Sequence, residues 1–175
     1  MPGTISAATV AAVLSLHPVN TTLASPRLDF PVRQLHCLSS ATYHEARSLS
    51  AKAQAAVAYT VMNRRHNQEL FKRQDTICKV VIAPGQFPWV LKRQPSHRRY
   101  RLEDKNAWRD IVHLSAEVVN NQVHNPVPGA THFCMARFKN LYDWCRNGVH
   151  IATIEGIRFV KLRKTQKSIV PRKRS

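Results

Sequence analysis

The fold is decided by residues 32–66, which read VRQLHCLSSATYHEARSLSAKAQAAVAYTVMNRRH. The first half predicts a helix, because the residues of one face recur at three- and four-residue spacing. That face consists of Leu35, Leu38, Thr42 and Glu45. Ser50 is a suitable N-cap for a second helix, whose alanine-rich face predicts close packing against a neighbouring helix. The stretch therefore predicts two packed helices, with Glu45 on or beside the inward stripe of the first.

The remaining elements predict an α+β fold that is mostly helical, with a small antiparallel sheet near the C-terminus. Residues 77–83 form a short apolar run, and a Pro-Gly break then leads into a loop that contains QFPW. A third helix is predicted over about residues 103–120, where apolar residues recur on one side. The segment ATHFCMA, residues 130–136, is rich in β-branched and aromatic residues, and residues 150–162 predict a hairpin that turns at Glu155–Gly156.

Three parts are predicted along the chain: a leader or arm over residues 1–31, a domain over 32–162 and a basic tail over 163–175. The arm holds an apolar run over residues 7–16, which is too short to span a bilayer. No Lys or Arg precedes Arg27, so a cleaved signal peptide is not favoured. The 175 residues and the apolar share of 43% fit one globular domain.

Charge is the strongest global signal of the composition. Lysines and arginines number 27 against 10 acids, which gives a formal net charge of +17. Basic residues gather around Arg98 and in the tail. Such a chain is drawn to polyanions, which include nucleic acid, anionic membranes and the bacterial envelope, and charge alone does not choose among them. No nucleic-acid-binding motif accompanies the basic segments, so a dedicated reader of nucleic acid is not predicted.

The four cysteines show no CxxC pair and no zinc-finger spacing, so no metal site is predicted. Their even number is compatible with disulfides in an oxidising compartment. The alternative is four buried thiols, which the sequence alone favours slightly.

Glu45 is the candidate catalytic group. Cleavage of a sugar polymer needs a carboxylic acid that stays protonated near neutral pH, and burial raises the pKa of a carboxyl for that purpose. Glu45 lies beside Tyr43 and Ala46 above an apolar stripe, in a chain with few competing acids. The alternative is a surface acid paired with Arg47 or Lys52.

Two other chemistries are weaker. His132 and Cys134 would share one face of a strand, as a Cys–His nucleophile needs, yet no activating environment is readable around them. His132 could also serve a zinc amidase, but nothing marks a second or third ligand.

Seven segments together resemble the catalytic domain of the spore-cortex-lytic, SleB-like cell wall hydrolases, which also occur in phage lysis proteins. In chain order they are CLSSATYHEAR from residue 37, AQAAVAYTVMNR from 53, TICKVV from 76, GQFPW from 85, NAW from 106, PGATHF from 128 and GIRFVKL from 156. The resemblance spans about residues 35–162. It implies a lysozyme- or transglycosylase-like domain that cleaves the glycan strand of peptidoglycan, usually as a lytic transglycosylase without cofactor or metal.

The resemblance assigns roles to particular residues. The catalytic acid of the family maps onto Glu45. The glycan-contacting positions map onto Tyr43, Gln86, Phe87, Trp89, Thr131 and His132. Aromatic rings would stack on sugar faces, while amide and hydroxyl groups would bind the acetamido and hydroxyl groups of the glycan.

The sequence departs from the family pattern at three positions. Ser48 replaces a common glycine, Cys134 replaces the second histidine of a THYH-like segment, and Cys145 replaces a small residue after Trp144. Because two thiols are gained together, their Cα atoms are predicted to lie within roughly 7 Å, the reach of a disulfide.

The function predicted from these observations is a monomeric peptidoglycan-cleaving enzyme that acts on the bacterial cell wall in the periplasm. It would be a phage endolysin or virion component rather than a protein secreted by a signal peptide, and it would have no stable membrane span. Its basic surface would add nonspecific attraction to the anionic envelope or to nucleic acid. The alternative is a basic virion or nucleic-acid-binding protein on a degenerate hydrolase scaffold.

Overall fold

The computed structural model describes residues 31–91 and 102–162. The predicted arm up to residue 30, the basic residues around Arg98 and the predicted tail over 163–175 lie outside the described residues. Within the described ranges, no helix has both the length and the apolar character needed to cross a bilayer.

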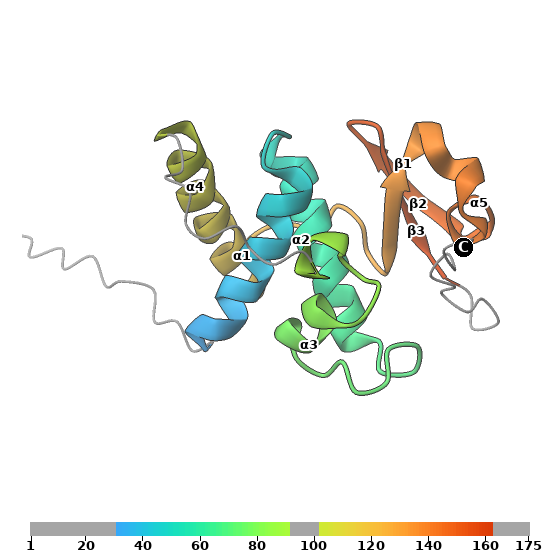
Figure 1. Cartoon of the computed structure of the whole chain (residues 1–175), viewed down its shortest axis with the longest axis horizontal. Coiled ribbons are helices and arrows are strands. Elements are labelled where there is room, and N and C mark those ends of the chain that lie inside the picture. Colours follow the sequence, from blue (N-terminus) through green and yellow to red (C-terminus); the bar gives the residue numbers. More distant parts are fainter. Residues whose placement is uncertain (1–30, 92–101, 163–175) are drawn as a thin grey trace, which may run out of the picture.

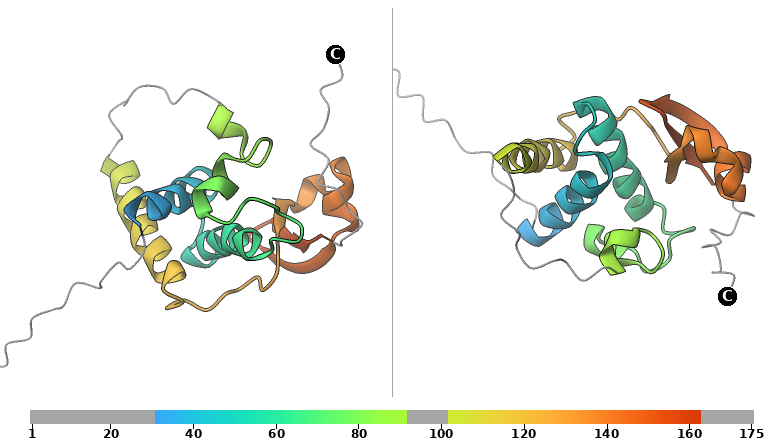
Figure 2. Two further views of the ribbon diagram at one scale, coloured as in Figure 1. Left: turned by 90° about the horizontal axis from the view of Figure 1, so that it is seen from below. Right: turned by 45° about the horizontal axis from the view of Figure 1, so that its top comes forward.

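The two helices predicted from residues 32–66 are confirmed as α1 (Val32–Ala46) and α2 (Ala51–His66). The Ser50 hydroxyl accepts a hydrogen bond from the backbone N–H of Ala53 at 3.4 Å, which confirms the predicted N-cap. The predicted third helix is α4 (Leu102–Val119). Figures 1 and 2 show α1 between α4 and α2, with α2 between α1 and the sheet.

The segment between α2 and α4 contains two short helices. The apolar run becomes α3 (Ile77–Ile82), capped by Thr76, whose hydroxyl accepts from the N–H of Lys79. The predicted QFPW loop begins as a turn and continues into the 3₁₀ helix η1 (Pro88–Leu91).

The predicted antiparallel sheet is confirmed and has three strands in the order β1-β3-β2. These are β1 (His132–Met135), β2 (Val149–Ile154) and β3 (Ile157–Lys161), and the 3₁₀ helix η2 (Ala136–Leu141) and α5 (Asp143–Asn147) connect β1 to β2. The hairpin turns where predicted, with positive φ angles of 46° at Glu155 and 77° at Gly156. The Glu155 carboxylate accepts the N–H of Ser50 at 3.2 Å, which ties the hairpin tip to the start of α2.

The core joins the helices to the sheet, as the predicted α+β class requires. Each of five elements contributes a fully buried side chain: Leu38 of α1, Val57 of α2, Ile77 of α3, Ile111 of α4 and Phe159 of β3. Burial of this apolar surface is the main favourable term in folding.

All four cysteines are paired in the structure. Cys37 of α1 is bonded to Cys78 of α3, and Cys134 of β1 is bonded to Cys145 of α5. The preference for four buried thiols is therefore wrong, because the folded chain brings both pairs into disulfide reach. The Cα atoms of Cys134 and Cys145 lie 6.4 Å apart, which confirms the predicted proximity.

Candidate active site

Glu45 lies in the last turn of α1, where its side chain is half-buried. The indole Nε1 of Trp89, in η1, donates a hydrogen bond to Glu45 Oε1 at 3.0 Å. Within residues 31–91 and 102–162, no basic side chain is within salt-bridge distance of Glu45. Arg47 is one of the two cations with which a surface Glu45 was expected to pair. Its guanidinium instead lies 5.3 Å from the centroid of the Tyr43 ring.

The surroundings of Glu45 raise the pKa of its carboxyl. Burial is the dominant cause, because it penalises the charged form. The hydrogen bond from Trp89 and the charge of Arg64 both lower that pKa, but they do not cancel the effect of burial. Glu45 therefore keeps its proton to a higher pH than an exposed glutamate, as a proton donor requires.

Arg64 of α2 is a buried cation near this carboxyl, with only 4% of its surface exposed. Its Nε donates to the backbone carbonyl of Thr131, and its guanidinium carbon lies 5.6 Å from the centroid of Phe87 and 6.0 Å from that of Phe71. Burial lowers the pKa of Arg64 to about 10, which leaves it charged at neutral pH. In the described part of the chain its Nη1 has no hydrogen-bond partner.

Two further aromatic rings pack on Trp89, which holds the Glu45 carboxyl. The His44 and Trp89 rings are stacked with centroids 4.3 Å apart, and Phe87 lies 5.9 Å from Trp89. Phe87 is buried, whereas Trp89 is half-exposed and His44 is exposed. Burial, and then the charge of Arg47, lower the pKa of His44, which favours the neutral form of the imidazole that is stacked on Trp89.

Thr131 and His132 lie at the start of β1, on the other side of Arg64. Thr131 Oγ1 accepts the N–H of Leu162 at 3.3 Å and lies 3.1 Å from His132 Nδ1. The hydroxyl proton can then be donated to Nδ1, which places the ring proton on Nε2. Burial, with the charge of Arg64, lowers the pKa of His132 to about 3, so this ring is neutral at working pH.

The buried neutral His132 makes a testable contribution to stability. The folded state disfavours its protonation, so the unfolded state binds more protons between pH 6.5 and about 3. Stability should therefore fall as pH drops through that window, by up to about 1.4 kcal/mol per pH unit for one proton. His132→Gln removes the titration and keeps an acceptor for Thr131. Denaturant unfolding across the window should show a flatter pH dependence for the variant, and parallel curves would contradict this account.

The structure brings most of the predicted site residues together, but not all of them. Glu45 is hydrogen-bonded to Trp89, and Phe87 packs on Trp89. Arg64 links Glu45 to Thr131 and His132, because it is bonded to the Thr131 carbonyl and its charge acts on both Glu45 and His132. Tyr43 points toward α4 instead, where its hydroxyl donates to Asp104 at 3.2 Å and its ring lies 5.6 Å from Trp108. Contact of these residues with a glycan stays a prediction.

Two groups near Glu45 were absent from the predicted site, namely Arg64 and His44. Arg64 had a readable signal, because an arginine four residues after Thr60 falls on the buried face of α2, where an unpaired charge is costly. His44 had no such signal, since its contact with Trp89 depends on where the loop after α3 folds.

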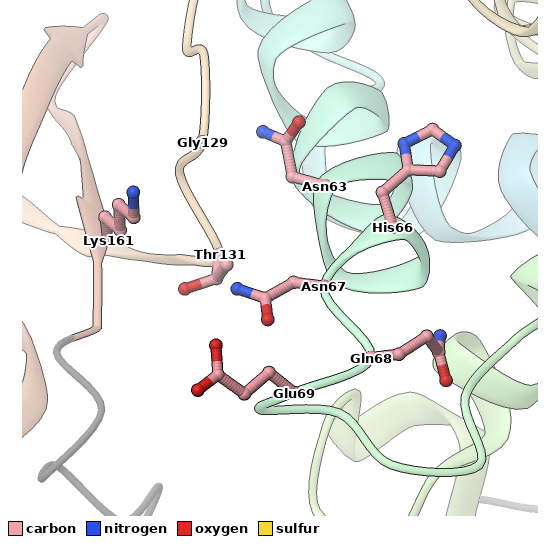
Figure 3. A pocket seen from close by; sticks show the side chains of 8 residues that line it. All are labelled: Asn63, His66, Asn67, Gln68, Glu69, Gly129, Thr131 and Lys161. Carbon is pink, nitrogen blue, oxygen red and sulfur yellow. The ribbon is translucent and has the colours of Figure 1, made fainter.

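A separate cavity of about 540 Å³ lies between the C-terminal end of α2 and the sheet. It is lined by Asn63, His66, Asn67, Gln68, Glu69, Gly129, Thr131 and Lys161 (Figure 3). Thr131 alone belongs to the predicted site, and Glu45 is not part of the lining. The cavity is therefore distinct from the surroundings of the Glu45 carboxyl.

The chemistry available at Glu45 is that of a single proton-donating carboxyl beside aromatic rings and a buried cation. Among the described residues, no group of three or more His, Cys, Asp or Glu side chains is arranged to hold a metal ion. One half-buried acid can protonate a leaving oxygen and then, as a carboxylate, accept a proton.

Comparison with known proteins gives one match. A family model described as Cell Wall Hydrolase matches residues 49–160, which include Arg64, Phe87, Trp89, Thr131 and His132. No curated protein and no solved structure matches. The matched range begins after Glu45, so the role of that residue depends on its geometry and on the motif around it.

Proposed function

This chain belongs to the cell wall hydrolase family, and we propose that it cleaves peptidoglycan glycan strands between N-acetylmuramic acid and N-acetylglucosamine, with Glu45 as the catalytic acid. Family membership makes it a peptidoglycan-degrading enzyme. We propose in addition which glycosidic bond the enzyme cleaves and that Glu45 is its catalytic acid. The observation that carries the proposal is the half-buried Glu45 carboxyl, whose pKa is raised and which is held by Trp89.

The proposed mechanism is that of a lytic transglycosylase. Glu45 donates its proton to the glycosidic oxygen as the bond from muramic C1 to that oxygen breaks, which releases the N-acetylglucosamine side as an alcohol. The Glu45 carboxylate then takes the proton from the muramic C6 hydroxyl. As it does so, the oxygen of that C6 hydroxyl bonds to muramic C1. The product is a 1,6-anhydro ring, and Glu45 is again protonated. These two reaction steps need one carboxyl group and no water molecule.

The groups around Glu45 have supporting roles in this proposal. Trp89 and His44 offer rings beside the carboxyl, on which a sugar can stack, and the buried Phe87 supports Trp89 from behind. The buried charge of Arg64 stabilises the carboxylate that forms after the first proton transfer. Gln86, which is half-buried beside Phe87, would bind polar groups of the sugar.

We further propose that the protein acts in the periplasm as a phage-encoded lysis or virion component. Two disulfides fit an oxidising compartment, in which such bonds persist. The net charge of +17 favours association with the anionic envelope.

The proposed reaction is tested on purified sacculi by mass spectrometry of the released fragments. A lytic transglycosylase yields anhydromuramic ends that are lighter by one water than the products of hydrolysis. Reducing ends on muramic acid would support a muramidase with the same acid. Failure to release any glycan fragment would support the alternative of a degenerate scaffold.

The hydrogen bond from Trp89 should set where activity falls at high pH. This bond favours the charged form of Glu45, so Trp89→Phe should raise the pKa of Glu45 further. A general acid works while it is protonated, and the alkaline limb of kcat/KM should therefore move to higher pH. Trp108→Phe is the matched control, because Trp108 contacts Tyr43 and His36. A limb that stays in place or moves to lower pH would refute this role.

A further inference from the structure

Among the described residues, the exposed large apolar side chains are concentrated in one segment. Of the six large hydrophobic residues that are exposed among those described, four lie between residues 135 and 149. They are Met135 at 41%, Phe138 at 43%, Leu141 at 71% and Val149 at 40% exposure. Clustered apolar exposure on a soluble domain marks an interaction surface more often than scattered exposure does. We call the exposed side chains of residues 135–149 the amphiphilic face.

The helix η2 presents the centre of this face. None of its six residues is buried. In a 3₁₀ helix, side chains three residues apart are eclipsed, so Phe138 and Leu141 project along the same line. The two most exposed apolar side chains of the segment thus form one ridge.

Cations flank the ridge. The exposed cations of the face are Arg137, Lys139 and Arg146. Asp143 is its one acid, so three cations and one anion give the face a net charge of +2. The guanidinium of Arg137 lies 4.7 Å from the centroid of the Phe138 ring. Asp143 is paired with Arg146 at 2.8 Å. The face therefore combines apolar tips with a positive rim.

The face is held in place by contacts at its ends. The disulfide between Cys134 and Cys145 closes the segment between β1 and α5. The N–H of Ala136 donates to the carbonyl of Gly156 at 2.7 Å, and Arg158 Nε donates to the carbonyl of Cys145 at 3.3 Å. A preorganised face loses less conformational entropy when it binds than a flexible loop would.

We propose that the amphiphilic face docks the protein on an anionic phospholipid bilayer. Apolar side chains enter the boundary between headgroups and acyl chains, while nearby cations bind lipid phosphates. The net charge of +17 complements such a surface. A glycan strand offers no apolar layer for Leu141 to enter, which favours lipid over the substrate as the occupant. This proposal does not depend on the proposed cleavage reaction.

The apolar part of the proposal is tested by sedimentation of the full chain with vesicles. Wild type should bind phosphatidylethanolamine vesicles that contain phosphatidylglycerol, and should bind phosphatidylcholine vesicles weakly. Phe138→Ser with Leu141→Ser should lower the partition coefficient by at least about tenfold, since each buried methylene contributes to membrane binding. Val32→Ser with Ile82→Ser is the matched control, because those residues are exposed elsewhere, and it should stay near wild type.

The charged part is tested with a second pair of variants. Arg137→Gln with Lys139→Gln should weaken binding more than Lys52→Gln with Lys72→Gln, which makes the same change of net charge at exposed positions elsewhere. Equal losses in the two pairs would overturn the proposal, because charge alone would then explain binding.

Three further results would overturn the proposal. One is the absence of binding by wild type to anionic vesicles. Another is retention of binding by the Phe138 and Leu141 variant. The third is a dimer in solution that this variant abolishes, which would assign the face to a second copy of the chain. Cleavage of sacculi and thermal unfolding of each variant, unchanged from wild type, would show that the exposed substitutions leave the fold intact.

Discussion

The Glu45→Gln variant is expected to lose wall-cleaving activity by at least about 10²–10⁴-fold, the range that general acid catalysis usually contributes. Glutamine has nearly the same shape, and its side-chain oxygen can still accept the hydrogen bond from Trp89 Nε1. It cannot donate a proton to the glycosidic oxygen. The loss is measured as the rate of turbidity decrease of outer-membrane-permeabilised cells and as fragment release from sacculi.

The stability of the same variant separates a catalytic role from a structural one. Because the folded-state pKa of Glu45 is raised, ionisation of Glu45 destabilises the fold as pH rises through that pKa. Replacement by a neutral glutamine should therefore leave the melting temperature at neutral pH unchanged or slightly higher. Glu117→Gln is the matched control, since Glu117 lies on α4 and pairs with His113 at 3.4 Å, and it should retain activity. An active Glu45→Gln enzyme would refute the assignment.

The parts of the fold that could be predicted are those with local signals. The Ser50 cap, the inward stripe of α1 and the Glu155–Gly156 turn each depend on residues close in sequence, and all three are confirmed. Residues 77–82 were harder to assign, because an apolar run of that length suits a strand or a buried helix equally well. The cap at Thr76 is the signal that would have favoured the helix.

The candidate site was predictable only in part, since its contacts join distant segments. The hydrogen bond between Glu45 and Trp89 spans 44 residues, and no local pattern specifies where the loop after α3 returns to α1. The place of Trp89 in the predicted site came from the family motif GQFPW. The disulfide connectivity had the same limit, because four cysteines allow three pairings. The sequence indicated only the proximity of Cys134 and Cys145, because both thiols occur at departures from the family pattern.

Removal of the disulfide between Cys37 and Cys78 is expected to have the larger effect on stability of the two. The cysteines are separated by 41 residues in this pair and by 11 in the pair of Cys134 and Cys145. A longer closed loop restricts the unfolded chain more, which corresponds to about 4 kcal/mol for the first pair and about 3 kcal/mol for the second. The double variants Cys37→Ser with Cys78→Ser and Cys134→Ser with Cys145→Ser, compared by denaturant unfolding, test this order.

The same comparison should separate stability from catalysis, because the first disulfide connects the two segments that build the site. Cys37 lies two turns before Glu45 on α1, and Cys78 lies on α3, which leads through a turn to Phe87 and to Trp89 of η1. Loss of this link leaves α3 held to α1 by packing and by the hydrogen bond from the N–H of residue 78 to Gln34. The Glu45–Trp89 contact should therefore loosen, and activity should fall at temperatures where the variant is still folded. Loss of the second disulfide should leave cleavage of sacculi near wild type. A result in which the shorter loop costs more stability, or in which both variants lose activity equally, would contradict this division between the two disulfides.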